Sequence, residues 1–227
     1  MNSILMFSLE LERLLLDCLA PQYCLGCQTV GQWYCADCLN SLGALEVKQY
    51  MDQIYYFFPY ATPLIQTTVQ QLKYFGLHPL PQALVAHWQS EYTGESLKHA
   101  LGYQGPGQGV LMPVPISKTR RKRRGYNQAE VLAKSVSGWV GWPVWDCLLK
   151  KEGVSMVGQN KQTREQIGDS FTGHQGRFQQ LSQEGVREVW VIDDVITTGS
   201  TLRACMDRVN EHLPGVKVRG LALAHEL

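Results

Sequence analysis

The sequence predicts an α/β protein built on a parallel sheet, and three observations lead to this fold class. Residues 188–192 form a short apolar run rich in β-branched and aromatic side chains, as expected for a strand buried on both faces. After Gly199 the apolar residues recur at helical spacing, at Leu202, Cys205, Met206, Val209 and Leu213. At 227 residues, the chain can hold one such domain and a small appendage.

Composition and the N-terminal segment argue against several classes of protein. The formal net charge is only +1, so no global field attracts the chain to nucleic acid. No segment is long and apolar enough to span a membrane. Residues 1–21 are rich in leucine but contain charged side chains, and they lack the positive leader of a secretion signal. We expect an amphipathic helix packed on the protein there, with a membrane-surface helix as the alternative, and a cytoplasmic location.

Four of the seven cysteines form two Cys-x-x-Cys pairs with seven residues between them: Cys24, Cys27, Cys35 and Cys38. This spacing is typical of a tetrahedral zinc site, and four sulfur ligands leave no position for water, so we expect structural Zn²⁺. The alternatives are a redox-active pair and a degenerate copy without metal. An odd number of cysteines and no signal peptide indicate a reducing compartment. The other three, Cys18, Cys147 and Cys205, lie in apolar surroundings and are expected in the core.

The middle of the chain predicts ordinary α/β elements. Residues 53–60 form an aromatic-rich strand, and two helices over 63–75 and 79–88 each begin with proline. Residues 93–109 are polar and rich in glycine, which predicts a loop leading to a strand over 110–114.

A basic run follows that strand, and we expect it on a loop just ahead of a helix. It comprises Lys118, Arg120, Arg121, Lys122, Arg123 and Arg124. Asn127 with Glu130 three residues later predicts a capping box at the start of the helix. The buried stripe of this helix would be Leu132, Val136, Trp139 and Val140.

Three interpretations of the basic run stay open. Guanidinium groups pair well with phosphate oxygens, so the run could neutralise a leaving pyrophosphate. It could instead bind the backbone of single-stranded DNA, with Tyr126 stacked on a base. The third interpretation is a solvated basic loop that binds no ligand.

The junction after residue 192 predicts a site for a sugar phosphate. A loop between a strand end and a helix start collects free backbone N–H groups and the positive end of a helix dipole, which favours phosphate. The loop residues are Val195, Thr197, Thr198, Gly199, Ser200 and Thr201. Asp193 and Asp194 would repel phosphate unless they bind sugar hydroxyls or hydrated Mg²⁺. Because neighbouring strand residues point to opposite faces, both acids reach one ligand only if the strand ends at Asp194.

The alternative is the end of a strand at the surface of another nucleotide-binding α/β protein, with threonines that only cap the helix. A strand, two acids, three threonines and a glycine within eleven residues is a more restrictive pattern than a lone glycine-rich turn.

These motifs resemble those of known proteins. The run 191–201 is similar to the motif of type I phosphoribosyltransferases that binds phosphoribosyl pyrophosphate (PRPP). Residues 113–130 resemble the signature of the ComF/GntX family of competence-associated proteins, and the cysteine pairs resemble its N-terminal zinc module. The resemblance covers nearly the whole chain. It implies an N-terminal helix and zinc module over 1–46 and a phosphoribosyltransferase-like domain over 47–227.

The resemblance also implies roles for individual residues. Asp193 and Asp194 would hold the ribose hydroxyls of PRPP, and the loop 197–201 its 5-phosphate. Ser117 and Arg124 would contact pyrophosphate together with Mg²⁺. The element 72–76 is similar to one common in the family, and its Lys73 either faces the ligand or is a solvated lysine.

Two functions remain open from the sequence. In the first, a PRPP-binding protein acts in DNA uptake or utilisation, with single-stranded DNA or a competence helicase as its partner. In the second, an active phosphoribosyltransferase transfers ribose 5-phosphate to an unidentified acceptor. Residues 150–171, which correspond to the mobile flap of related enzymes, depart from the family pattern, so turnover stays open.

Overall fold

The computed structural model describes residues 21–90, 92–100, 109–152 and 170–226 of two compact units, Met1–Ala44 and Leu45–Leu227. The N-terminal helix expected over 1–21, the core position expected for Cys18 and most of the flap-like segment fall outside the described residues. Within the ranges described, we find no helix that combines the length and the apolar character needed to cross a bilayer.

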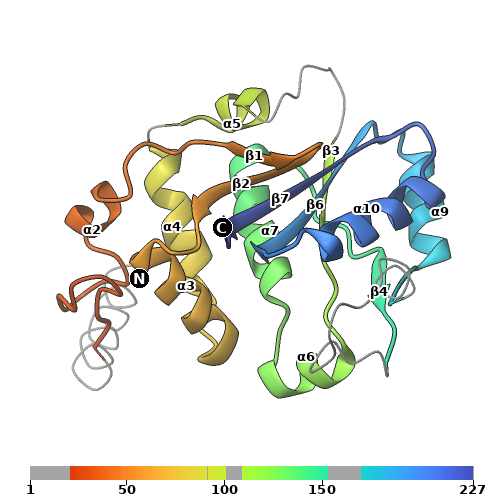
Figure 1. Ribbon diagram of the computed structural model, residues 1–227. Coiled ribbons are helices and arrows are strands. Elements are labelled where there is room, and N and C mark those ends of the chain that lie inside the picture. Colours follow the sequence, from red (N-terminus) through yellow and green to blue (C-terminus); the bar gives the residue numbers. More distant parts are fainter. Residues whose placement is uncertain (1–20, 91, 101–108, 153–169, 227) are drawn as a thin grey trace, which may run out of the picture. The chain divides into compact units, whose positions relative to one another are not determined.

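The larger unit is built around a five-stranded, mostly parallel sheet, which confirms the expected fold class (Figure 1). In spatial order the strands are β1 (Lys48–Met51), β2 (Ile54–Pro59), β7 (Lys217–His225), β6 (Glu188–Ile196) and β3 (Gly109–Pro113). Only β1 pairs antiparallel, on the edge beside β2, and the other three pairings are parallel. A separate antiparallel pair consists of β4 (Leu148–Lys150) and β5 (Phe171–Gly173).

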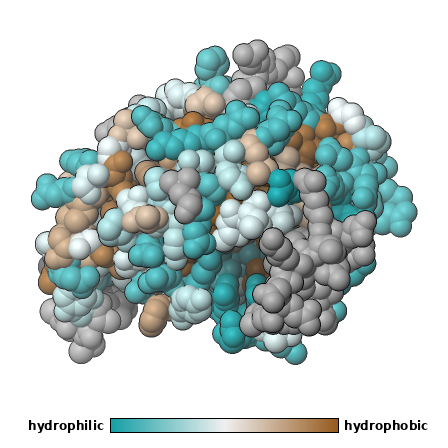
Figure 2. Space-filling model, in the orientation of Figure 1, coloured by the Kyte–Doolittle hydropathy of each residue, from teal (hydrophilic) through white to brown (hydrophobic). Residues whose placement is uncertain are grey.

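Seven helices of this unit lie within the described residues. They are α3 (Pro63–Tyr74), α4 (Pro79–Gln89), α5 (Gly94–Ala100), α6 (Lys118–Arg124), α7 (Gln128–Val140), α9 (Gln175–Gln183) and α10 (Ser200–His212). The smaller unit contains one further described helix, α2 (Ala36–Asn40). The surface seen in Figure 2 is mostly hydrophilic, with hydrophobic residues confined to small areas.

Strand β6 lies inside the sheet, between β7 and β3, and its residues 188–192 are buried on both faces, as their apolar sequence requires. Val189 and Val191 belong to one core cluster with the apolar residues of α10, α9, β4 and β5. Trp190, which alternates with them, packs edge-on against Trp142 with ring centres 4.7 Å apart. Neighbouring side chains of β6 therefore point to opposite faces of the sheet, and the same alternation continues at Asp193 and Asp194.

Three expectations about local structure were wrong. The basic run forms the helix α6, because the Ser117 hydroxyl accepts a hydrogen bond from the amide of Arg120 at its start. Its end is at Gly125, whose φ of 82° suits glycine. Residues 94–100 of the expected loop form α5, and residues 101–108 fall outside the described ranges. Strand β6 continues to Ile196 rather than ending at Asp194.

The capping box expected for α7 is only half formed. The Asn127 side chain accepts a hydrogen bond from the amide of Ala129, as an N-cap residue should. Glu130 does not reach back to it, because its two carboxylate oxygens pair with Arg121 at 3.0 Å and Lys134 at 2.7 Å. Glu130 therefore ties α6 to α7, and these cations outweigh the effect of burial and lower its pKa.

A buried ion pair joins the starts of β6 and β7 and gives a stability prediction. Glu188 and Arg219 are 4% and 3% exposed, with 3.1 Å between the carboxylate and Nε, and Trp190 donates to the same carboxylate oxygen. We expect Glu188→Gln to lower the free energy of unfolding by about 3 kcal/mol, because it leaves a buried guanidinium without its counter-charge.

The measurement is urea unfolding of the purified protein at neutral pH. Replacing both partners, as in Glu188→Leu/Arg219→Met, should cost less than the single change, since no buried charge remains. A single variant that unfolds at the wild-type urea concentration would contradict this role for the pair.

Candidate functional site

The candidate site lies at the edge of the sheet where the parallel strands end. Pro59 of β2 pairs with His225 of β7, and His225 pairs with Ile196 of β6. At the end of β3, the amide of Val114 donates to the carbonyl of Ile192. The segments that follow β2, β3 and β6 are therefore brought to one edge, which is where α/β sheets generally bind ligands (Figure 1).

The loop between β6 and α10 has the geometry expected of a phosphate-binding turn. Gly199 precedes α10 with a φ of 68°, so the backbone turns sharply into the helix. The hydroxyls of Thr198 and Ser200 lie 2.8 Å apart, and Arg203 donates to the carbonyl of Thr198 at 2.9 Å. A small cavity of about 20 Å³ is lined by Asp193, Val195, Ile196, Thr197, Gly199, Ser200, Thr201 and Leu202. The loop thus lines a small hollow with hydroxyl-bearing side chains at the start of a helix, where phosphate groups are favoured.

Strand β1 packs against this loop. A Cβ on Gly199 would lie 3.1 Å from Cε1 of Tyr50, and it would also require an unfavourable positive φ. Arg203 of α10 contacts the sulfur of Met51 at 2.9 Å. The Tyr50 ring also lies against His225, with ring centres 4.1 Å apart. Strand β1 therefore contacts the loop on one side, and its Tyr50 leaves little room for any residue other than glycine at position 199.

The two acids point into different surroundings because β6 remains a strand beyond them. Asp193 follows the alternation of Val189 and Val191 and so faces the α10 side of the sheet. Its Oδ1 accepts a hydrogen bond from the amide of Asp194 at 2.9 Å. Asp194 faces the opposite side, where its carboxylate meets α3. A single ligand must therefore lie across the end of β6 to meet both acids.

The surroundings of Asp193 favour its neutral form. Burial is the main reason that its pKa is raised well above the ordinary aspartate value, and the carboxylate of Asp194 adds to the rise. The amide of Asp194 and the ammonium group of Lys73 act in the opposite direction but do not cancel it. A carboxyl group held in this way gains much from a hydrogen-bond donor or cation that arrives with a ligand.

Lys73 pairs with Asp194 across the site. The ammonium and carboxylate groups lie 3.0 Å apart, with side chains 26% and 13% exposed. Burial acts to lower the pKa of Lys73, but the charges of Asp194 and Asp193 outweigh it and raise that pKa. Lys73 is therefore charged at neutral pH and paired with Asp194, so it is not the solvated helix lysine of the second interpretation.

The end of the basic helix α6 lies beside the end of α3. Tyr126 donates from its hydroxyl to the carbonyl of Leu72, and its ring lies 3.9 Å from that of His78. Arg124 lies over the ring of Tyr74 at 5.7 Å. Figure 1 shows α3 and α6 beyond the ends of the parallel strands. These contacts hold Arg124 and Lys73 on neighbouring elements.

Tyr126 is placed differently from what base stacking would require. Its side chain is only 8% exposed, and its hydroxyl is used inside the protein. Burial raises its pKa despite the nearby charge of Arg124. Tyr126 is therefore a packing residue that joins α3 to α7, and its ring is not presented to a base.

The other basic residues of α6 are largely exposed. Arg121 is held by Glu130, whereas Lys122 and Arg123 make no ion pair among the described residues. Arg120 lies close enough to Lys150 of β4 that its charge, after burial, helps to lower the pKa of Lys150. A carboxylate oxygen of Glu152 already accepts from the amide of Lys118 at 2.5 Å. The start of α6 is thus partly occupied by this acid.

The four cysteines of the smaller unit come together as their spacing predicts. Their sulfur atoms all lie within 4.8 Å of one another. The first pair is held by a tight turn in which the amide of Gln28 donates to the carbonyl of Cys24, and Tyr23 and Val30 form an antiparallel bridge. A zinc ion with bonds of about 2.3 Å to sulfur needs sulfurs about 3.8 Å apart, so the cluster could hold a structural zinc ion.

The thiols differ in acidity because they compete for charge in a small volume. Burial acts to raise the pKa of Cys24, but the amides of Cys27 and Cys35 outweigh it and lower that pKa to about 6. The pKa of Cys38 is raised strongly, chiefly by its contact with Cys35. A bound dication would remove this conflict, since it stabilises all four thiolates at once.

Two of the cysteines expected in the core lie there, and a lysine that the sequence did not indicate lies near Asp193. Cys147 and Cys205 are fully buried, as expected, and Cys205 packs below Asp193. Lys150 was not singled out in the sequence, although its charge acts on Asp193 and its ammonium lies 5.0 Å from the ring of Phe171. Lys150 ends the three-residue strand β4, and no motif in the sequence indicates a role for it.

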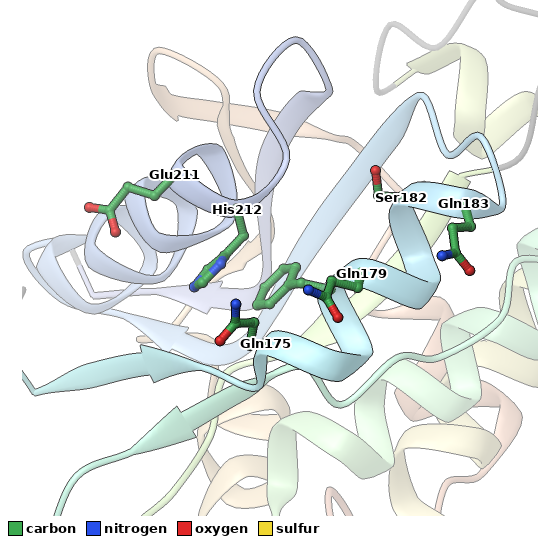
Figure 3. Close-up of a pocket in the computed structure, with 7 residues that line it drawn as sticks. Gln175, Gln179, Ser182, Gln183, Glu211 and His212 are labelled. Carbon is green, nitrogen blue, oxygen red and sulfur yellow. The ribbon is translucent and has the colours of Figure 1, made fainter.

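A larger hollow elsewhere does not belong to this site. Figure 3 shows it between α9 and α10, where Gln175 and His212 face each other. It has a volume of about 640 Å³ and polar walls, and Glu211 also lines it. Because α10 begins at the ligand edge and ends at His212, this hollow lies toward the opposite edge of the sheet.

Comparison with known proteins gives two curated relatives. Competence protein F of Haemophilus influenzae is 27% identical over 206 residues, which cover 89% of this chain and 85% of that protein. DNA utilization protein YhgH of Salmonella typhimurium is 27% identical over 153 residues, covering 62% of this chain and 59% of that protein. No family model matches the chain.

Among solved structures, adenine phosphoribosyl transferase from Trypanosoma brucei is similar, with a TM-score of 0.41 and 11% identity over 80% of this chain and 86% of that one. Its crystal structure is a complex with AMP, pyrophosphate and ribose-5-phosphate. The curated homologues of the chain are thus a competence protein and a DNA utilization protein, which confirms the resemblance to the ComF/GntX family.

Proposed function

We propose that this chain is a PRPP-binding, phosphoribosyltransferase-like protein that acts in DNA uptake or utilisation. The observation that carries the proposal is the acidic pair at the end of β6, beside a loop that turns at Gly199 and lines a small hollow. A sugar phosphate supplies both the anion that such a loop accepts and the hydroxyls that carboxylates bind. The names of the two curated relatives support the connection with DNA.

Each group has a role in this proposal. The loop Thr197–Thr201 holds the 5-phosphate, and Asp193 and Asp194 accept hydrogen bonds from the ribose hydroxyls. Lys73 and Arg124 stand on the α3 and α6 side, where their charges favour the pyrophosphate group. Carboxylates beside phosphates suit Mg²⁺, which would supply further neutralising charge when bound.

The second candidate function, transfer of ribose 5-phosphate to an acceptor, rests on the same acids. When pyrophosphate leaves C1 of the ribose, positive charge develops on the sugar. The carboxylate of Asp194 would favour that charge, and Asp193 would add to it once the bound ligand or its cation ionises it. The bond from C1 to the pyrophosphate oxygen breaks as a bond to the acceptor forms, and the acceptor loses a proton. Pyrophosphate release that depends on an added nucleobase would establish transfer over binding alone.

The first test of the proposal is calorimetric titration with PRPP and Mg²⁺. We expect Asp194→Asn to weaken binding about 10-fold to 100-fold, because it removes a charged acceptor from the ribose hydroxyls. Asp207→Asn is the matched control, since Asp207 is an exposed acid on α10. Unchanged affinity in the Asp194 variant, with saturable binding in the wild type, would show that PRPP binds elsewhere.

A second prediction concerns stability and follows from the raised pKa of Asp193. Its carboxyl group is held in the folded protein with a pKa above its unfolded value of about 3.9. Folding stability from this group therefore falls as pH rises above about 4, until pH passes the folded pKa. Asp193→Asn lacks this loss, so its melting temperature should exceed that of the wild type increasingly from pH 4 to 7.

The measurement is thermal unfolding at several pH values without ligand. The exposed Asp207→Asn change should leave the wild-type pH dependence intact. If the melting temperatures of Asp193→Asn and the wild type differ by the same amount at every pH, the pKa of Asp193 is not raised in the folded protein and the prediction is wrong. The same variant should bind PRPP more weakly, as expected of a group retained for function at a cost in stability.

The cysteine cluster gives a third prediction, on metal content. We expect one zinc ion per purified chain, and Cys24→Ser should abolish it because the remaining three sulfurs leave the tetrahedral set incomplete. Metal content by atomic emission is the readout. Cys147→Ala is the control, since Cys147 is a buried core residue outside the cluster, and it should retain the metal. Zinc-free wild-type protein with four titratable thiols would contradict the assignment.

A further inference from the structure

Two aromatic residues at the end of α3 are unusually exposed. Tyr74 and Phe75 expose 67% and 69% of their surface, which exceeds every other large hydrophobic residue among those described. Residues of this size are normally at least half-buried, and two adjacent exposed rings form an apolar surface that water solvates poorly. Neither ring contributes to the core, so packing does not explain them.

The two rings line a pocket together with basic residues. Its volume is about 530 Å³, and its lining residues are Lys73, Tyr74, Phe75, Gly76, Arg123 and Arg124. Three of these six side chains are cationic, and none is acidic. Such a combination of flat apolar rings and positive charge suits a ligand that is both aromatic and anionic.

Arg124 is arranged to serve such a ligand. Its guanidinium group lies over the Tyr74 ring at 5.7 Å, and its Nε is buried without a hydrogen-bond partner within the described part of the chain. Arg123, the neighbouring lining residue, is exposed. A phosphate at the mouth of the pocket would satisfy these donors while an attached ring stacks on Tyr74 or Phe75.

We propose that Tyr74 and Phe75 form a stacking site for the bases of single-stranded nucleic acid, with Arg123 and Arg124 on its phosphates. The exposed bases of a single strand offer the ring faces that a duplex keeps stacked. Lys122 adds a further exposed cation on α6, outside the pocket. This additional charge favours a nucleic-acid strand, which carries several phosphates, over a free nucleobase, which carries none. This site takes the stacking role that the buried Tyr126 cannot fill.

The inference deepens the DNA role in the proposed function and rests on it, but it does not require PRPP binding. Lys73 lines the pocket and also pairs with Asp194, so the two sites are adjacent. Arg124 is shared by the two proposed sites. Nucleic-acid binding and PRPP binding can nevertheless fail separately, because the rings of Tyr74 and Phe75 serve only the first, and Asp193, Asp194 and the loop 197–201 serve only the second. The experiment therefore measures each ligand on the same set of variants.

The test uses fluorescence anisotropy with labelled oligothymidylate of about 15 nucleotides and an abasic strand of equal length and charge. We expect the full-length protein to bind the oligothymidylate more tightly than the abasic strand. Tyr74→Ala/Phe75→Ala should weaken oligothymidylate binding by at least about 5-fold and up to about 150-fold, the loss expected for one base stack. The same change should leave affinity for the abasic strand unaltered.

Three controls make the result specific. Tyr74→Phe retains a ring and should keep wild-type affinity. Arg123→Ala should weaken the binding of both oligonucleotides equally. It should also reduce the slope of log affinity against log salt concentration by about one, the loss of one phosphate contact. PRPP should still bind Tyr74→Ala/Phe75→Ala saturably, with a smaller loss of affinity than that for the oligothymidylate, because Asp193, Asp194 and the loop 197–201 are unchanged. Saturable binding also shows that the variant is folded.

Two outcomes would overturn the inference. Equal binding of the oligothymidylate and the abasic strand would show that charge alone is recognised. Saturable binding of a free nucleobase that is lost in the double variant, with no binding of either strand, would assign the rings to a small acceptor instead. If the strand results hold but PRPP does not bind the wild type, the proposed PRPP site fails while this one stands.

Discussion

The ion pair between Lys73 and Asp194 is the interaction on which the candidate site depends. Two adjacent carboxylates at the end of one buried strand repel each other, and burial makes both charges costly. Lys73 supplies the opposing charge from α3, a helix distant from β6 in sequence. The pair thereby fixes the end of α3 beside the strand and allows one acid to remain charged. The residues that follow Lys73, including the exposed rings, take their positions from this contact.

Much of the fold could be predicted because each signal was local. The apolar run of β6, the proline starts of α3 and α4 and the glycine before α10 each specify an element without reference to the rest of the chain. The spacing of the cysteines was equally sufficient, since two tight turns bring the sulfurs together. The basic run was assigned to a loop because the capping signal of the next helix, at Asn127, comes after it, although Ser117 and Gly125 are ordinary helix-capping residues.

The arrangement of the site could be predicted only in part, because it depends on contacts between distant segments. No pattern indicates that Lys73 meets Asp194 or that Lys150 acts on Asp193, since these pairs form only when the sheet is assembled. Tyr126 illustrates the same limit. Its position beside a basic run suggested a ligand, whereas the carbonyl of Leu72 and the ring of His78 occupy its hydroxyl and its face. The ring that reaches solvent is Tyr74, at the end of another helix.

The contact between Tyr50 and Gly199 has a consequence for how the loop between β6 and α10 holds its shape. Strand β1 has only one neighbour in the sheet, and its register with β2 shifts between Gln49 and Met51. Tyr50 and Met51 of this strand nevertheless contact Gly199 and Arg203 at the start of α10. If PRPP binds as proposed, fraying of β1 would loosen the backbone of this loop, so affinity for the phosphate would depend on a strand that does not line the hollow.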